Sequence, residues 1–173
     1  MAIVKEVNDN IIKMVRDGEY DMMVHGCNCF GIMGAGLARQ VAMVFPEAYI
    51  TDRGLDENGE MKEPLGNYNR LGTYTKAVVE GNTIINAYTQ FEPGAHFEYT
   101  ALIDVLACLN NDFAGSVILF PEIGCGIGGG TWSVVKQIIN EHTPDLDIIV
   151  VHYDNGTKRM GQAKLNLESE SEG

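Results

Sequence analysis

Basic residues are scarce in this sequence. Lysine and arginine together number 12, against 24 aspartates and glutamates, so the formal net charge is −12 at pH 7. Such a charge repels the backbone of a nucleic acid, which needs a basic surface to bind. We therefore expect no nucleic-acid partner. A small anion can still bind, because backbone N–H groups attract it without any basic side chain.

Long apolar runs and closely spaced cysteines are also missing. No run approaches the roughly 18 residues of a membrane-spanning helix, and residues 1–6 lack the basic and apolar parts of a signal peptide. The spacing of the four cysteines matches no disulfide framework; they are Cys27, Cys29, Cys108 and Cys125. We expect a cytoplasmic protein with reduced thiols and no membrane association.

The sequence does contain an alternation of strand and helix patterns along 173 residues, the length of one domain. Strands are predicted at residues 3–7, 20–25, 72–79, 83–88, 116–121 and 147–153, and helices at 11–15, 37–45, 97–109 and 134–139. Pro46 ends the second helix or breaks it before another, and residues 52–69 predict a polar surface loop. Near-continuous apolar strands that alternate with helices indicate an α/β sandwich, with a mostly parallel or mixed sheet covered on both faces. We place one domain at residues 1–154 and expect the polar, acidic residues 155–173 to be disordered.

Two glycine-rich loops each follow a predicted strand and precede a predicted helix. They occupy residues 26–36 and 121–130. Strand ends of an open α/β sheet are where ligands bind, and glycines let backbone N–H groups approach a phosphate. We therefore expect both loops to close over one ligand. Gly124-x-Gly126-x-x-Gly129 fits a dinucleotide fingerprint, but too little chain follows it for a Rossmann half, and neither loop ends like a Walker loop.

The two loops together resemble the macro domain family. The residues that carry the resemblance are His25-Gly26-Cys27-Asn28-Cys29, Met33-Gly34-Ala35-Gly36-Leu37-Ala38 and the run from Pro121 to Trp132. The most similar branch includes the ADP-ribose 1''-phosphate phosphatases, and the resemblance extends from about Val4 to Tyr153. It implies a three-layer α/β/α sandwich with a mixed, mostly parallel sheet, and ADP-ribose lying across the carboxyl edge of that sheet. It also implies hydrolysis of ADP-ribose 1''-phosphate to ADP-ribose and phosphate, without a metal or other cofactor. The alternative is a non-catalytic module that recognises free or protein-linked ADP-ribose.

The resemblance also implies which residues contact an ADP-ribose derivative. They are Asp9, Asn10, Ile11, Gly26, Cys27, Asn28, Met33, Gly34, Ala35, Gly36, Leu37, Ala38, Gly124, Cys125, Gly126, Ile127, Gly128, Gly129 and Gly130. Asn28 matches the asparagine beside the distal ribose, where a carboxamide can donate to and accept from hydroxyls. At the adenine end, Asn10 or Asp9 can accept from the amino group, and a simple helix cap is the alternative role.

Candidates for catalysis are fewer. His25, Asn28 and Gln90 can orient a water molecule or stabilise the phosphate. Some macro domains that remove ADP-ribose from proteins or DNA use a lysine and an acid where this chain has Gln90 and Gly128, and neither residue supplies an amine or a general base. That mechanism is therefore not expected here. A metal at His25, Cys27 and Cys29 is also not expected, because no Cys-x-x-Cys pair exists, and small buried thiols explain the pattern. The oligomeric state is not predicted.

Overall fold

Six strands form one mixed sheet in the computed structural model, which describes residues 2–61 and 66–153. The strands are β1 (Ile3–Asp9), β2 (Met22–Asn28), β3 (Tyr74–Val79), β4 (Asn82–Gln90), β5 (Val117–Phe120) and β6 (Asp147–Tyr153). Their order across the sheet is β1-β6-β5-β2-β4-β3. Only the pairing of β3 with β4 is antiparallel, so the predicted mixed, mostly parallel sheet is confirmed.

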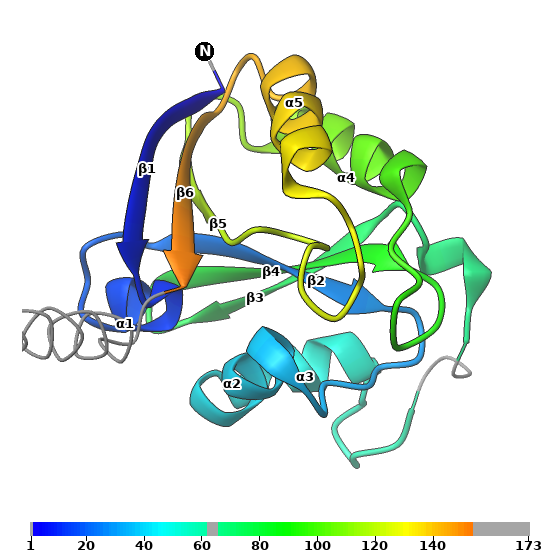
Figure 1. The fold of residues 1–173 in the computed structure, drawn as a ribbon. Helices are drawn as coiled ribbons and strands as arrows, with labels where there is room; N and C mark the ends of the chain where they lie inside the picture. The colour runs from blue at the N-terminus through cyan, green and yellow to red at the C-terminus, as the bar shows by residue number, and fades with distance from the viewer. Residues whose placement is uncertain (1, 62–65, 154–173) are drawn as a thin grey trace, which may run out of the picture.

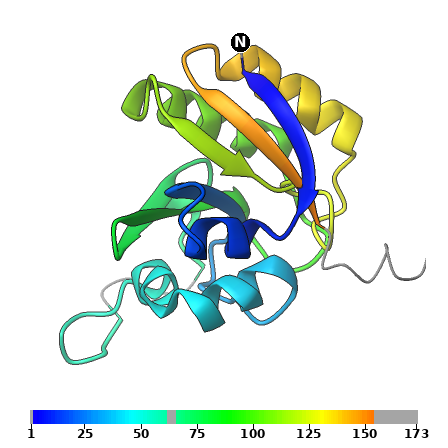
Figure 2. The same cartoon turned by 90° about the vertical axis from the view of Figure 1, so that its left-hand side faces the viewer.

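Helices cover both faces of this sheet. They are α1 (Ile11–Arg16), α2 (Gly36–Val44), α3 (Pro46–Arg53), α4 (Tyr99–Asp112) and α5 (Trp132–His142), with a short 3-10 helix, η1 (Tyr68–Arg70). Figures 1 and 2 show α1, α2 and α3 on one face and α4 and α5 on the other. The predicted three-layer α/β/α sandwich is therefore confirmed. Within the described ranges, no helix has both the length and the apolar character needed to cross a membrane.

The near-continuous apolar strands arise because both faces of the sheet are buried. Neighbouring residues on one strand point to opposite faces. On β2, Val24 packs in the cluster that contains α4 and α5, whereas Met23 packs in the cluster beneath α1 and α2. On β5, Ile118 and Leu119 divide in the same way. Two apolar cores of this kind hold the strand ends of the sheet in fixed positions.

The segment after α2 differs partly from its prediction. Pro46 is the first residue of α3, where its missing N–H leaves no helical hydrogen bond unmade, so it separates two helices. The predicted loop at residues 52–69 begins with the last turn of α3 and contains η1. Asp52 in this segment is 1% exposed, although its sequence context is polar. The predicted tail at 155–173, and Asp154 at the end of the predicted domain, lie outside the described residues.

The parallel strands bring their carboxyl ends to one edge of the sheet. The last residues of β1, β2, β4 and β6 are Asp9, Asn28, Gln90 and Tyr153, and Phe120 ends β5 between them. The two glycine-rich loops follow β2 and β5, which are neighbours in the sheet. The loops therefore begin side by side.

Candidate functional site

A cavity of about 570 Å³ lies at the carboxyl edge of the sheet. Its volume falls in the range of small-molecule sites, roughly 300–1,000 Å³. Residues from both glycine-rich loops line it, together with the ends of β1, β2, β4 and β6. A Cβ atom built on Gly36 of the first loop would lie 3.3 Å from the Ile127 side chain of the second. The two loops thus approach each other across one cavity.

Most of the residues predicted for the site line this cavity, and four do not. Asn10 caps α1, where its side chain accepts a hydrogen bond from the N–H of Lys13 at 3.1 Å. Met33 is buried in a small cluster with Cys27, Cys29 and Tyr88. Gly129 and Gly130 fold the second loop back on itself through their N–H groups, which donate to carbonyls of that loop. These four residues shape the walls and do not line the cavity.

Several lining residues were missed from the sequence. Tyr153 is the last residue of β6, Glu122 lies two residues after the end of β5, and Pro93 and Gly94 belong to the loop after β4. The signal that could have found Glu122 and Tyr153 is their position at the carboxyl end of a parallel strand. Pro93 and Gly94 carried no such signal, because a surface turn explains both residue types.

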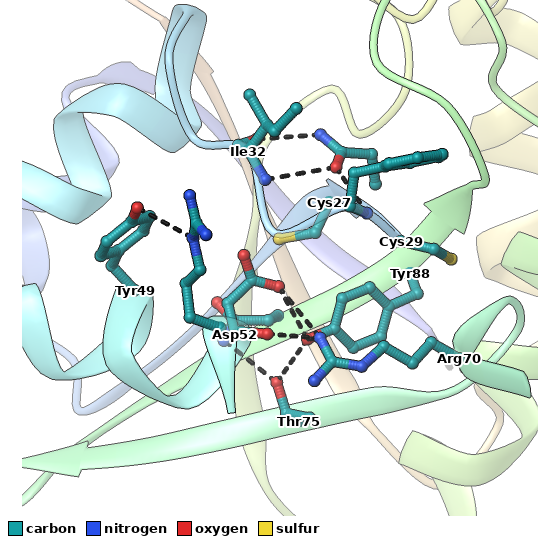
Figure 3. A network of polar contacts seen from close by, with 12 residues as sticks. Cys27, Cys29, Ile32, Tyr49, Asp52, Arg70, Thr75 and Tyr88 are labelled. Atoms are coloured by element: carbon teal, nitrogen blue, oxygen red, sulfur yellow. Dashed lines mark hydrogen bonds and ion pairs between the residues drawn. The ribbon is translucent and has the colours of Figure 1, made fainter. Parts of the chain in front are cut away.

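Asn28 organises the first loop. Its Nδ2 donates to the carbonyl of Ile32 at 2.9 Å, and its Oδ1 accepts from the N–H groups of Phe30 at 3.0 Å and Ile32 at 3.3 Å. The two bonds to Ile32 are visible in Figure 3. Since both lone pairs of Oδ1 are used, only the second N–H of Nδ2 remains for a ligand. The contact of Asn28 with a distal ribose stays a prediction, and in this loop arrangement its Nδ2 is the group left to make it.

Two runs of backbone N–H groups in the loops have no hydrogen-bond partner among the described residues. From Gly34 to Ala38, the backbone N–H groups make no hydrogen bond within the described part of the chain, since α2 begins there without a side-chain cap. In the second loop, the same holds for Gly126, Ile127 and Gly128 among the residues described. The cavity is therefore bordered by two runs of backbone donors.

Glycine is required at some of these loop positions and tolerated at others. Gly124 has a φ of +76°, and a Cβ atom there would lie 2.3 Å from the ring of Phe97. At Gly126, a Cβ atom would meet nothing within 4 Å. Gly124 therefore fixes the shape of the loop, whereas Gly126 borders open space.

No cationic side chain assists these donors. Among the described residues that line the cavity, none is lysine or arginine. His25 is buried, and its Nε2–H donates to Oδ1 of Asn86 at 2.6 Å. Burial lowers the pKa of His25 to about 4, although the hydrogen bond that His25 donates to Asn86 opposes the shift, so the imidazole is neutral near pH 7. A neutral, buried His25 is poorly suited to donate a proton or to pair with an anion.

The two cysteines that line the cavity are thiols. Burial raises the pKa of Cys125 to about 11, and it raises the pKa of Cys27 well above its usual range. Cys27 Sγ also lies 3.6 Å from Nε2 of His25. Since the thiolate is the nucleophile and the metal ligand, neither cysteine is prepared for that chemistry. In residues 2–61 and 66–153, no group of three or more His, Cys, Asp or Glu side chains could hold a metal ion.

Gln90 and Asp9 each keep one acceptor for a ligand. The Nε2 group of Gln90 donates to the carbonyls of Glu92 at 2.7 Å and Gly94 at 2.8 Å, so its Oε1 is the remaining polar atom. Oδ1 of Asp9 accepts from the N–H of Asn10 at 2.7 Å, which leaves Oδ2. Asp9 and Tyr153 are paired residues of β1 and β6, so they lie side by side at the opposite end of the cavity from Gln90.

A buried polar network around Asp52 and Tyr88 lies beside the site (Figure 3). Oδ1 of Asp52 accepts from the hydroxyl of Tyr88 at 2.8 Å, and Nη1 of Arg70 lies 3.7 Å from the same oxygen and donates to the carbonyl of Asp52. The hydroxyl of Tyr88 also lies 2.9 Å from Oγ1 of Thr75. Oδ2 of Asp52 is buried and has no hydrogen-bond partner among the described residues, and burial raises the pKa of this carboxyl. The network joins α3, β3 and β4 next to the cluster that contains Cys27.

Known proteins are similar to this chain in sequence or in architecture. An uncharacterised 17.5 kDa protein of the tk–vs intergenic region of Enterobacteria phage T4 is 34% identical over 156 residues, covering 88% of this chain and 97% of the phage protein. The macrodomain of Thermus aquaticus DarG superposes with a TM-score of 0.64 at 23% identity, covering 88% of this chain and 97% of that one. Thermosipho africanus DarTG in complex with ADP-ribose superposes with a TM-score of 0.60 at 19% identity, covering 80% and 39%. No family model matches the chain.

Proposed function

Because this chain belongs to the same family as the phage T4 17.5 kDa protein and has the macrodomain fold, we propose that its cavity binds ADP-ribose. The observation that carries the proposal is the pair of unpaired N–H runs, at 34–38 and 126–128, around one cavity without a cationic side chain. Several N–H donors close together are what a diphosphate requires. The ADP-ribose complex of the Thermosipho protein, which has the same fold, supports the choice of ligand.

The proposed orientation follows from the acceptors and donors at the two ends of the cavity. The adenine lies at the β1–β6 end, where Oδ2 of Asp9 accepts from its amino group beside the half-exposed ring of Tyr153. The diphosphate lies between the two glycine-rich loops. The distal ribose lies at the β2–β4 end, where Asn28 donates and Gln90 accepts.

Titration calorimetry with ADP-ribose tests this function. We expect saturable heat and an increase in melting temperature, because a ligand that binds only the folded state stabilises it. An absence of both heat and thermal shift at millimolar ADP-ribose would contradict the proposal and leave a structural or interaction role.

The adenine position leads to a second prediction. Replacing Asp9 by alanine is expected to weaken ADP-ribose binding about tenfold, the value of a hydrogen bond to a charged group. Ribose 5-phosphate, which has no adenine, is expected to bind both proteins equally. Calorimetry with the two ligands measures the difference.

Asn10 provides the matched control. Asn10→Ala removes the cap of α1, so we expect a loss of about 1 kcal/mol in stability and unchanged affinity. The reverse result, with ADP-ribose affinity lost in Asn10→Ala and kept in Asp9→Ala, would assign the adenine contact to Asn10.

We also propose slow hydrolysis of ADP-ribose 1''-phosphate, with recognition without turnover as the alternative. The observation that favours turnover is that Gln90, with its remaining acceptor, and Asn28, with its remaining donor, are paired neighbours on β4 and β2 at one end of the cavity. Oε1 of Gln90 can accept a hydrogen bond from a water that attacks phosphorus, while Asn28 donates to a phosphate oxygen. The water oxygen forms a new P–O bond as the P–O bond to ADP-ribose breaks, and a proton of the water passes to the departing 1''-oxygen, so that ADP-ribose and inorganic phosphate are released. His25 supports the loop in this scheme and transfers no proton.

Phosphate release decides between turnover and binding alone. We expect release above that of a Gly34→Glu control, and we expect Gln90→Ala to lower kcat at least tenfold with KM changed less than threefold. Release no greater than in the control, by a protein that binds ADP-ribose, would make it a binding module.

A further inference from the structure

A chain of four charged or ionisable side chains leads from α5 across the sheet to the mouth of the cavity. Nζ of Lys136 lies 2.8 Å from Oε2 of Glu6, and Nε2 of His152 lies 3.0 Å from Oε1 of Glu6. Nδ1 of His152 then lies 3.6 Å from Oε1 of Glu122. The contacts with Lys136 and His152 lower the pKa of Glu6, so its carboxylate is ionised near neutral pH. These contacts link Glu122 to two strands and a helix.

His152 is held on three sides in this chain. Its two ring nitrogens each meet a carboxylate, and the indole of Trp132 packs edge-on against its ring with the centroids 5.8 Å apart. Glu122 nevertheless stays open to the cavity: its side chain is 44% exposed and belongs to the lining. His152 faces Oε1 of Glu122, so Oε2 is the oxygen left for a ligand.

The place of Glu122 along the sheet identifies the part of the ligand it meets. Glu122 follows β5, and its partner His152 is on β6. In the sheet order, these strands lie between β1, which carries Asp9, and β2, which begins the first glycine-rich loop. If adenine lies at Asp9 and the diphosphate lies between the loops, the adenosine ribose lies over β6 and β5. The inference rests on the proposed function in this respect.

We propose that Glu122 makes the site selective for an adenosine ribose whose 2'- and 3'-hydroxyls are unmodified. A carboxylate accepts hydrogen bonds and donates none, so it suits the hydroxyls of a vicinal diol. A phosphate ester on either hydroxyl would bring a charge of about −1.5 to −2 next to it. Among the described lining residues no lysine or arginine could compensate. The site therefore accepts ADP-ribose and rejects its 2'-phosphorylated form.

A comparison of the affinities for two ligands tests the selectivity. The affinities of the protein for ADP-ribose and for 2'-phospho-ADP-ribose are measured by calorimetry at low salt, where repulsion between exposed charges is least screened. We expect the wild type to bind ADP-ribose at least tenfold more tightly. Glu122→Gln is expected to reduce that ratio to less than threefold, because its neutral amide does not repel a phosphate on the ribose.

The matched control is Glu80→Gln. It also removes one negative charge, but Glu80 lies in the turn between β3 and β4, at the opposite edge of the sheet from the cavity. In Glu80→Gln, the ratio of the affinities for ADP-ribose and 2'-phospho-ADP-ribose is expected to equal that of the wild type. A lower ratio in this variant would attribute the selectivity to net charge and overturn the proposal. Equal affinities in the wild type, or a ratio unchanged in Glu122→Gln, would overturn it while ADP-ribose binding stands. A wild type that binds neither ligand removes the proposed function and this inference together.

Discussion

Replacing Gly126 by glutamate is expected to lower the affinity for ADP-ribose at least a hundredfold and to leave the fold intact. A Cβ atom at this position meets nothing within 4 Å, and its φ is one that other residues adopt, so the backbone tolerates a side chain. The carboxylate then extends into the space that borders the unpaired N–H groups of the loop and repels a diphosphate there. Calorimetry measures the affinity, and circular dichroism with thermal melting checks the fold.

Gly126→Ala separates charge from bulk in this experiment. The methyl group keeps all the backbone donors and adds no charge, so we expect an affinity within about threefold of the wild type. If alanine and glutamate weaken binding equally, the loop acts through its conformation and not as the diphosphate site. Native circular dichroism with undiminished affinity in Gly126→Glu would contradict the assignment of the loop altogether.

The sequence was informative about the fold because both faces of the sheet are buried. A strand such as β2, with Met23 and Val24 in different cores, has no polar face and reads as an unbroken apolar run. Runs of this kind, alternating with helical spacing, distinguish a mixed α/β sheet from an antiparallel one with a solvated face. The glycine-rich loops were recognisable because a residue such as Gly124, with its positive φ and no room for a Cβ, admits little else.

The polar details of the site could not be read in the same way, because they depend on contacts between distant residues. Asn28 was expected to bind ribose hydroxyls with both ends of its amide, but the loop that follows it occupies the oxygen. Asp9 and Asn10 were interchangeable in the sequence until the start of α1 made Asn10 the cap. The side chain of Glu122 is positioned by its contact with His152, which lies 30 residues later in the sequence. In each case a polar contact within the fold, not the residue type, decided the role.

Tyr88→Phe is expected to destabilise the protein by about 2–3 kcal/mol, because it leaves a buried carboxylate without its hydrogen-bond donor. The ring of Tyr88 is fully buried and its packing is unchanged in phenylalanine. The lost hydroxyl is the donor to Oδ1 of Asp52, whose Oδ2 already lacks a partner. For a chain of this size the loss corresponds to a melting temperature lower by roughly 4–12 °C. Tyr88 does not line the cavity, so we expect the affinity for ADP-ribose to change less than threefold.

The pH dependence of this loss identifies Asp52 as its origin. Burial raises the pKa of Asp52 above its unfolded value of 3.8, so its contribution to stability is complete below that value and falls as the pH rises through the folded pKa. Removing the Tyr88 hydroxyl, which stabilises the carboxylate, raises the folded pKa further. The difference in melting temperature between wild type and variant should therefore be larger at pH 7.5 than at pH 4.5. Tyr74→Phe, which loses an exposed bond to Asp112, is the matched control with a small change at both pH values. A loss for Tyr88→Phe that is equal at both pH values would indicate lost packing, and a deficit that grows toward pH 4.5 would contradict the raised pKa of Asp52.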